Sequence, residues 1–174
     1  GLGGVIAALT ADQTLREKAP EKTIAIVGDE GGPCYSRPML SKTSLKGFDL
    51  EKIYVKKKAW YSDKKIDLIY DTVLAIDPVK KEVACQESTL GYQKLIYTLG
   101  AYAFQPDVGQ PTLVLRTYRD LDAIKRHLPT ANDIAIVGGG VIGIETAIEL
   151  RNMGKTVTIY EIGDWLMPRL LDEG

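Results

Sequence analysis

The stretch from Ile134 to Glu161 constrains the fold more than any other part of this chain. It opens with an apolar run, passes through a cluster of glycines, continues with helical periodicity, and ends in a second apolar run whose last residue is an acid. A buried strand, a tight turn, a helix and a second strand form a parallel βαβ unit. The sequence therefore predicts an α/β fold.

The spacing of the glycines predicts what this unit binds. Gly138, Gly140 and Gly143 form a GxGxxG pattern. In such a pattern the first glycine permits the tight turn, the second lets the backbone approach a pyrophosphate, and the third lets the helix pack against the strand. The helix that begins at Val141 and Ile142 points free N–H groups and its positive dipole end toward the anion. We therefore expect a dinucleotide site here, the plainer alternative being a glycine-rich turn without function.

Glu161 indicates which dinucleotide is bound. It follows the middle glycine by about 20 residues, the distance at which an acid binds the ribose 2′-hydroxyl. Neither Ile162 nor Gly163 is basic, so a 2′-phosphate would meet a negative charge. The sequence predicts NAD(H) in preference to NADP(H).

The start of the chain has a similar but incomplete pattern. A helical face from Val5 to Leu15 precedes a buried-type strand over Thr23–Val27, which Gly28 and Asp29 close. The strand that should precede this helix is absent, and a lone helix and strand cannot make a parallel pairing. Because only a short segment follows Glu161, we expect both ends of the fold to be truncated.

Composition excludes some classes of function. The net charge of −1 gives no general attraction to nucleic acid or anionic membranes. No apolar run approaches the roughly 20 residues of a membrane span, and the start lacks a signal-peptide pattern. Cys34 and Cys85 form no CxxC motif, which favours a reducing cytoplasm. We expect a cytoplasmic protein without nucleic-acid or membrane partners.

Motifs in a fixed order along the chain point to one family. They are Ile24–Lys42 with its RPxLSK-like loop, Tyr54–Asp77, Tyr92–Ala101 (resembling YDxLIxATGA), Leu115–Asp120 (resembling LRTxxD) and Ile134–Asp172. The chain resembles the first half of a flavoprotein of the pyridine nucleotide-disulfide oxidoreductase superfamily. The nearest branch holds the NADH-dependent ferredoxin and rubredoxin reductases, the nitrite reductase flavin domain and apoptosis-inducing factor.

This resemblance implies two Rossmann-like modules, an FAD type interrupted by an NAD type, with a small antiparallel insertion around Tyr70–Gln86. Residues 1–115 would be a partial FAD-binding module, and residues 116–174 the start of the NAD-binding module. The implied activity is hydride transfer from NADH to the flavin of FAD, followed by electron delivery to a ferredoxin- or rubredoxin-like protein or a metal centre. It also admits a homodimer.

The resemblance assigns FAD contacts to the first module. Gly1 and Gly4 would be the middle and last glycines of an FAD fingerprint, although a rival register starts at Gly3. Thr98–Ala101 would bring a strand end and Gly100 against the pyrophosphate.

Two further contacts concern the adenosine part of FAD. Asp29 or its neighbour Glu30 would accept hydrogen bonds from the adenine ribose, unless Asp29 only forms an Asx turn. Val73 would read the adenine edge through its main chain.

Charged residues are implied around the flavin ring. Arg37 would lie by the flavin, Lys42 beneath it, and Glu145 would form a partly buried ion pair with Lys42 where the hydride crosses. A fixed cation there stabilises the negative charge of a reduced flavin. The alternative for Arg37 and Lys42 is two surface charges. Arg116 would approach the flavin or pair with an acid of the helix that follows.

Two other functions stay open. Cys34 could serve a thiol-dependent disulfide or coenzyme A disulfide reductase, although the chain has no CxxxxC pair. The chain could also be a non-catalytic NADH-binding remnant or sensor that lacks FAD.

Overall fold

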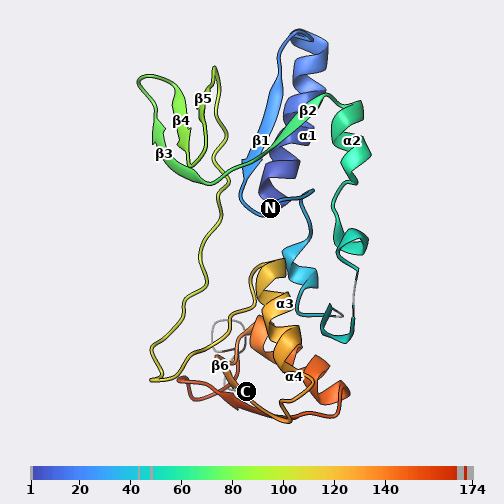
Figure 1. The fold of residues 1–174 in the computed structure, drawn as a ribbon, viewed down its shortest axis with the longest axis vertical. Helices are drawn as coiled ribbons and strands as arrows, with labels where there is room; N and C mark the ends of the chain where they lie inside the picture. Colours follow the sequence, from blue (N-terminus) through green and yellow to red (C-terminus); the bar gives the residue numbers. More distant parts are fainter. Residues whose placement is uncertain (1, 43, 48, 168–170, 172–174) are drawn as a thin grey trace. The chain divides into compact units, whose positions relative to one another are not determined.

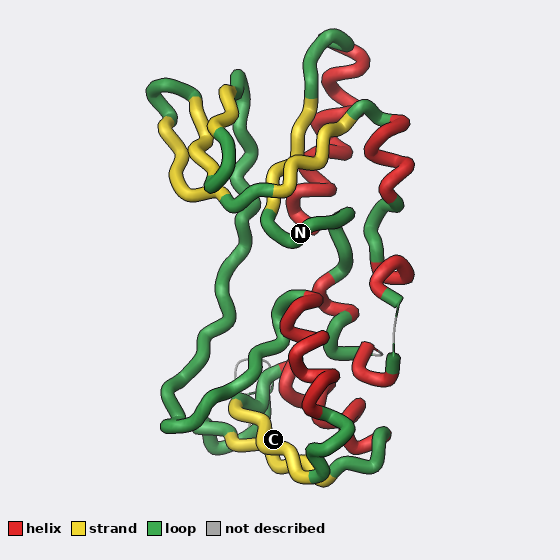
Figure 2. The backbone as a smooth tube through the Cα atoms, in the orientation of Figure 1, coloured by secondary structure: helices red, strands yellow, loops and turns green. Residues whose placement is uncertain are grey.

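The computed structural model describes residues 2–42, 44–47, 49–167 and 171. The chain divides into two compact units, one of Gly1–Ser36 with Ile53–Ala101, the other of Arg37–Lys52 with Tyr102–Gly174. Figures 1 and 2 show the elements of each unit.

The first unit is built on a parallel strand pair covered by helices. Its elements are α1 (Leu2–Lys18), β1 (Ile24–Gly28), α2 (Lys58–Asp63) and β2 (Ile66–Tyr70). β1 and β2 pair from Ile24↔Ile66 to Gly28↔Tyr70. β1 therefore has a parallel partner in β2, a strand that the sequence did not predict.

A small apolar core holds this unit together. Ala8 of α1, Ile24 of β1, Tyr61 of α2 and Ile66 of β2 are all less than 10% exposed and contact one another. Burial of a large apolar side chain stabilises by about 1.5–3 kcal/mol. Ile24, Tyr61 and Ile66 are large side chains, and Ala8 adds a small contact from α1, so the core fixes the packing of the four elements.

An antiparallel sheet follows β2, as the sequence predicts. Its strands are β3 (Val73–Asp77), β4 (Glu82–Cys85) and β5 (Thr89–Gly91), in the order β3-β4-β5. The register of β3 against β4 shifts between Val73 and Ala75.

The second unit contains the predicted βαβ pattern. β6 (Asp133–Val137) and β7 (Thr156–Tyr160) pair in parallel, and α4 (Val141–Asn152) connects them. α3 (Tyr118–His127) begins with a capping box between Thr117 and Asp120, a motif that satisfies the free N–H groups of a first turn. Short 3-10 turns, η1 (Arg37–Met39), η2 (Ser44–Lys46) and η3 (Leu50–Ile53), precede these elements in the chain. Of these turns, η2 packs against both α3 and α4.

One expected strand end is not observed. The structure has no strand over Tyr92–Ala101, and Tyr97 in this segment is 68% exposed. A strand needs a hydrogen-bonded neighbour, and no described strand pairs with this segment.

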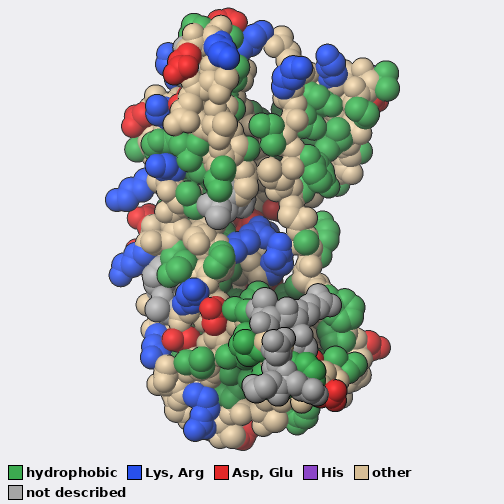
Figure 3. Space-filling view, turned by 180° about the vertical axis from the view of Figure 1, so that it is seen from behind, with side chains coloured by type: hydrophobic (Ala, Val, Ile, Leu, Met, Phe, Trp, Pro, Cys, Tyr) green, Lys and Arg blue, Asp and Glu red, His purple; other side chains and the backbone are tan. Residues whose placement is uncertain are grey.

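Large hydrophobic side chains stay exposed in both units. Leu74 in the first and Phe104 and Tyr160 in the second are at least 60% exposed, and Figure 3 shows hydrophobic side chains at the surface on one face. None of the described helices combines the length and the apolar character needed to cross a bilayer.

A buried carboxylate joins β2 to the antiparallel sheet. Asp71 is 7% exposed, and its oxygens accept hydrogen bonds from the Ser88 hydroxyl at 2.7 Å, the Thr72 N–H at 2.8 Å and the Glu87 N–H. These bonds, that of Ser88 first, lower the pKa of Asp71. Asp71 thus fixes the start of β3 to the β4–β5 turn, a role that its sequence position did not reveal.

The Asp71 network predicts a pH-dependent stability. Because its folded-state pKa lies below the unfolded value of about 3.9, its contribution is complete above that value and is lost as the pH falls through the folded pKa. Asp71→Asn should therefore lower the urea midpoint at pH 7, and the difference from wild type should shrink near pH 3. Glu82→Gln, at an exposed acid of β4, is the control. An Asp71→Asn deficit of equal size at both pH values would contradict this role.

Candidate functional site

The glycine loop after β6 adopts a conformation that favours glycine. Gly138 has a φ of +108°, in the region that side-chain-bearing residues rarely occupy. Its N–H donates to the Tyr160 carbonyl at 2.8 Å. The turn therefore closes directly against the end of β7.

Gly143 allows α4 to lie close to this turn. A Cβ at Gly143 would stand 2.1 Å from the Gly138 carbonyl oxygen and 3.4 Å from the Ile136 side chain. Any side chain here would push the helix away from the loop and the strand. The packing distance expected for the last glycine of the pattern is therefore observed.

The N-terminus of α4 is open. A Cβ at Gly140 would meet nothing within 4 Å. Gly140 is the N-cap residue, and because it has no side chain it supplies no capping hydrogen bond to the first turn. Val141 and Ile142 are 44% and 54% exposed. Because the first N–H groups of a helix lack partners within it, this geometry fits a pyrophosphate.

Glu161 lies beside the glycine loop, at the end of β7. Its Oε2 accepts from the Gly139 N–H at 2.6 Å, and its Oε1 from the Gly163 N–H at 2.9 Å. The Gly163 and Gly139 bonds lower the pKa of Glu161, so the side chain is a carboxylate at neutral pH. Each oxygen keeps a further acceptor position, as a ribose hydroxyl requires.

Gly139 is a part of this loop that the sequence analysis did not single out. A Cβ there would stand 2.5 Å from Leu166 Cδ2 and 3.1 Å from Glu161 Oε2. The Met167 N–H donates to the Gly139 carbonyl at 2.9 Å. The segment after β7 therefore packs on the loop, and a side chain at residue 139 would displace the Leu166 side chain. Three consecutive glycines were the available signal.

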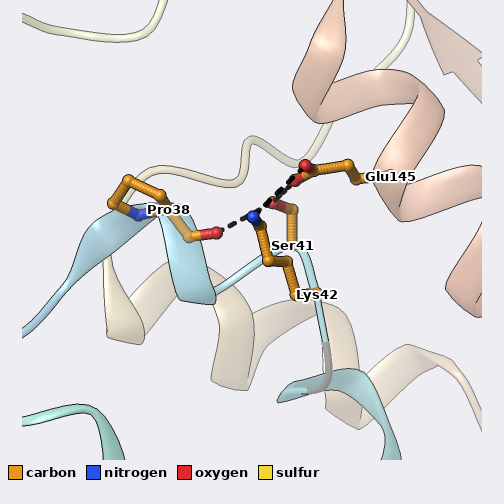
Figure 4. A network of polar contacts seen from close by, with 4 residues as sticks. All are labelled: Pro38, Ser41, Lys42 and Glu145. Carbon is orange, nitrogen blue, oxygen red and sulfur yellow. Dashed lines mark hydrogen bonds and ion pairs between the residues drawn. The ribbon is translucent and has the colours of Figure 1, made fainter.

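The predicted ion pair of Lys42 and Glu145 is present. Lys42 Nζ lies 3.7 Å from Glu145 Oε1, and the two side chains are 47% and 29% exposed. The Ser41 hydroxyl donates to Glu145 Oε2 at 2.6 Å (Figure 4). Glu145 stands little more than one turn into α4. The pair is half-solvated, so it adds little to stability, and Ser41 is a third member that the sequence analysis missed.

The two arginines occupy the starts of short elements. Arg37 begins η1. Arg116 immediately precedes the N-cap of α3, and its main-chain N–H donates to Asp120 Oδ2 at 3.1 Å. The predicted helix start is therefore present, while a flavin contact by either side chain stays a prediction.

In the first unit, Gly4 lies where α1 approaches its neighbours. A Cβ at Gly4 would stand 3.5 Å from Thr98 Oγ1 and 3.7 Å from Ile26 of β1. Gly100, just after Thr98, has a φ of +79°. The segment after β5 thus meets the start of α1 as a loop, and Gly1 lies outside the described residues.

The adenosine-binding candidates follow or begin strands. Asp29 is exposed just after β1, and Val73 opens β3. The Tyr35 hydroxyl donates to Glu30. This bond holds Glu30 within its own loop and leaves it further acceptor positions, so Asp29 and Glu30 both stay candidates for the ribose.

Cys34 is a poor candidate for thiol chemistry. It is 9% exposed and lies against Tyr61, whose pKa burial and the neighbouring Cys34 raise to about 12. Reactive thiols sit in partly exposed, electropositive surroundings. The observed burial favours a structural role.

Comparisons with known proteins agree with this geometry. The ferredoxin–NAD(+) reductase subunit of the benzene 1,2-dioxygenase system of Pseudomonas putida is 33% identical over 176 residues, which cover 98% of this chain and 43% of that protein. The corresponding component of the biphenyl dioxygenase system of Paraburkholderia xenovorans is also 33% identical, with the same coverage. The chain therefore spans less than half the length of these relatives.

Solved structures give the same result. NADH:rubredoxin oxidoreductase from Clostridium acetobutylicum matches with a TM-score of 0.80 and 29% identity, over 86% of this chain and 41% of that one. The reductase in a covalent putidaredoxin reductase–putidaredoxin complex matches with a TM-score of 0.81 and 26% identity, over 94% and 42%. The model of the pyridine nucleotide-disulphide oxidoreductase family matches residues 1–174, and the chain belongs to that family.

Proposed function

We propose that this chain is part of an NADH-dependent FAD oxidoreductase that passes electrons to a small redox protein. The observation that carries this proposal is the arrangement of α4. Its open N-terminus suits a dinucleotide, and Glu145, little more than one turn later, pairs with Lys42. One short helix therefore carries both the anion site and an ion pair suited to a redox cofactor.

The NAD(H) contacts would come from the second unit. The main chain of the glycine loop and the N–H groups of Val141, Ile142 and Gly143 would hold the pyrophosphate. Glu161 would accept from the ribose hydroxyls while Gly139 and Gly163 keep its carboxylate oriented and charged.

FAD, when bound, supplies the chemistry of accepting a hydride and releasing single electrons. Lys42 would place a positive charge near the ring, where reduction adds negative charge. Glu145 would keep that charge in place and leave it partly neutralised. Arg37 and Arg116 are the proposed further cations by the flavin.

The proposed contacts to the adenosine and phosphate parts of FAD belong to the first unit. Gly4 and Gly100 would let the main chain approach the pyrophosphate, and Gly100 has a φ of +79°, which favours glycine. Asp29 or Glu30 would bind the ribose, and Val73 would bind the adenine through its main chain. The proposed boundary between the two cofactor modules lies between residues 115 and 116.

The names of the relatives support the proposed acceptor. They include reductases of ferredoxins and a reductase caught in a complex with putidaredoxin. A ferredoxin- or rubredoxin-like protein is therefore the acceptor that we favour over another metal centre. The reduced, buried Cys34 and Cys85 are compatible with the proposed cytoplasmic location. A homodimer stays a prediction of the resemblance.

A second candidate function is an NADH-binding sensor without flavin. It is favoured by one contrast: the glycine loop, α4 and Glu161 form a complete unit, whereas the strand end expected at Thr98–Ala101 is not formed. Tight NADH binding by a flavin-free protein would distinguish it.

The oxidoreductase proposal predicts a visible spectrum. The purified protein should show flavin absorption, and NADH added without oxygen should bleach it. NADPH at the same concentration is the control and should bleach it more slowly. If the purified protein shows no flavin absorption, and added FAD does not bind to it, the oxidoreductase proposal is contradicted and the sensor is favoured.

The role proposed for Glu161 predicts a change in coenzyme preference. Glu161→Ser should weaken NADH binding by about tenfold, since it removes a charged hydrogen-bond acceptor, and it should weaken NADPH binding less. Asp164→Asn, an exposed acid three residues later, is the matched control. The dissociation constants come from titrations of NAD(P)H fluorescence. An unchanged NADH/NADPH ratio would exclude Glu161 as the ribose acid.

A further inference from the structure

Ser41 is a buried polar residue in a tightly turned loop. It is 3% exposed, beside Leu40 at 2%. The Leu40 N–H donates to the Arg37 carbonyl at 3.0 Å, and the Lys42 N–H to the Met39 carbonyl at 3.3 Å. These turns fix the main chain on both sides of Ser41, so its short side chain starts from a defined position.

The Ser41 hydroxyl has one hydrogen and two neighbouring acceptors. Glu145 Oε2 lies at 2.6 Å and the Pro38 carbonyl oxygen at 3.4 Å (Figure 4). Hydrogen bonds from a hydroxyl to a carboxylate are short, 2.5–2.7 Å, and about twice as strong as neutral ones. The hydrogen therefore goes to Glu145.

The two oxygens of Glu145 consequently have different neighbours. Ser41 binds Oε2, which fixes the rotation of the carboxylate and leaves Oε1 facing Lys42 Nζ at 3.7 Å. The long side chain of Lys42 is 47% exposed. A solvated ion pair alone does not hold a lysine and a glutamate side chain in one geometry. The buried hydroxyl can do so.

We propose that Ser41 is a positioning residue that orients Glu145, and through it the Lys42 ammonium, for hydride transfer. This inference rests on the proposed function, in which the Lys42–Glu145 pair borders the reacting rings. It differs from a purely structural role of Ser41, because its effect requires the Glu145 carboxylate.

The test is a double-mutant cycle in the flavin-loaded protein. It compares wild type, Ser41→Ala, Glu145→Ala and the double variant by anaerobic stopped-flow reduction with saturating NADH. Ser41→Ala should slow reduction by about tenfold, as expected for a lost hydrogen bond to a charge. Ser41→Thr, which keeps the hydroxyl, should restore most of the rate. In the Glu145→Ala background, Ser41→Ala should have no further effect.

Any of three results would overturn the proposal: a wild-type rate for Ser41→Ala, no rescue by Ser41→Thr, or an undiminished Ser41→Ala effect in the Glu145→Ala background. The first two measure the hydroxyl, and the third measures its dependence on Glu145.

A second readout needs no cofactor. In the apoprotein, the Ser41→Ala substitution should lower the urea midpoint more when it is made in the wild-type protein than when it is made in the Glu145→Ala variant. Additive shifts would overturn the Ser41–Glu145 coupling even if the flavin chemistry stands. Protein that takes up no flavin would refute the proposed function, and the urea cycle would then decide the role of Ser41 by itself.

Discussion

The contact between Gly143 and the carbonyl of Gly138 is the constraint on which the site depends. With a Cβ only 2.1 Å from that oxygen, residue 143 must be glycine for α4 to approach the turn after β6. This approach places the open start of α4 at the glycine loop, beside Glu161, and sets Glu145 little more than one turn further on. The anion site and the ion pair of Glu145 with Lys42 therefore follow from one backbone packing requirement.

Polar groups complete what this packing begins. Each important carboxylate is held by short, directed hydrogen bonds: Glu161 by the Gly139 and Gly163 amides, Glu145 by Ser41, and Asp71 by Ser88 and two amides. Such bonds restrict the rotation of each carboxylate. Of the two partners of Glu145, Lys42 is the more solvated and Ser41 is buried. In the proposed arrangement the Ser41 hydroxyl therefore defines the geometry of the carboxylate, and Lys42 supplies the charge.

The sequence predicted those parts that local patterns determine. The βαβ unit follows from periodicity and glycine spacing, whereas the antiparallel insertion was implied by the family resemblance. The Lys42–Glu145 pair came from the family resemblance. What could not be predicted depends on residues distant in sequence: β2 becomes a parallel partner only through contact with β1, and Ser41 and Asp71 act through partners 104 and 17 residues away. The strand end expected at Thr98–Ala101 is not formed, since no described strand pairs with this segment.

The central claim is that Lys42 serves a flavin, and the two-electron midpoint potential of the bound FAD tests it most directly. Lys42→Met removes the cation that stabilises the negative charge of the reduced ring, whereas Lys46→Met, at an exposed lysine of η2, is the matched control. We expect a potential more negative by about 30 mV or more for Lys42→Met, the equivalent of about a tenfold change in the equilibrium, and no change for Lys46→Met. Equal potentials for wild type and Lys42→Met would contradict it.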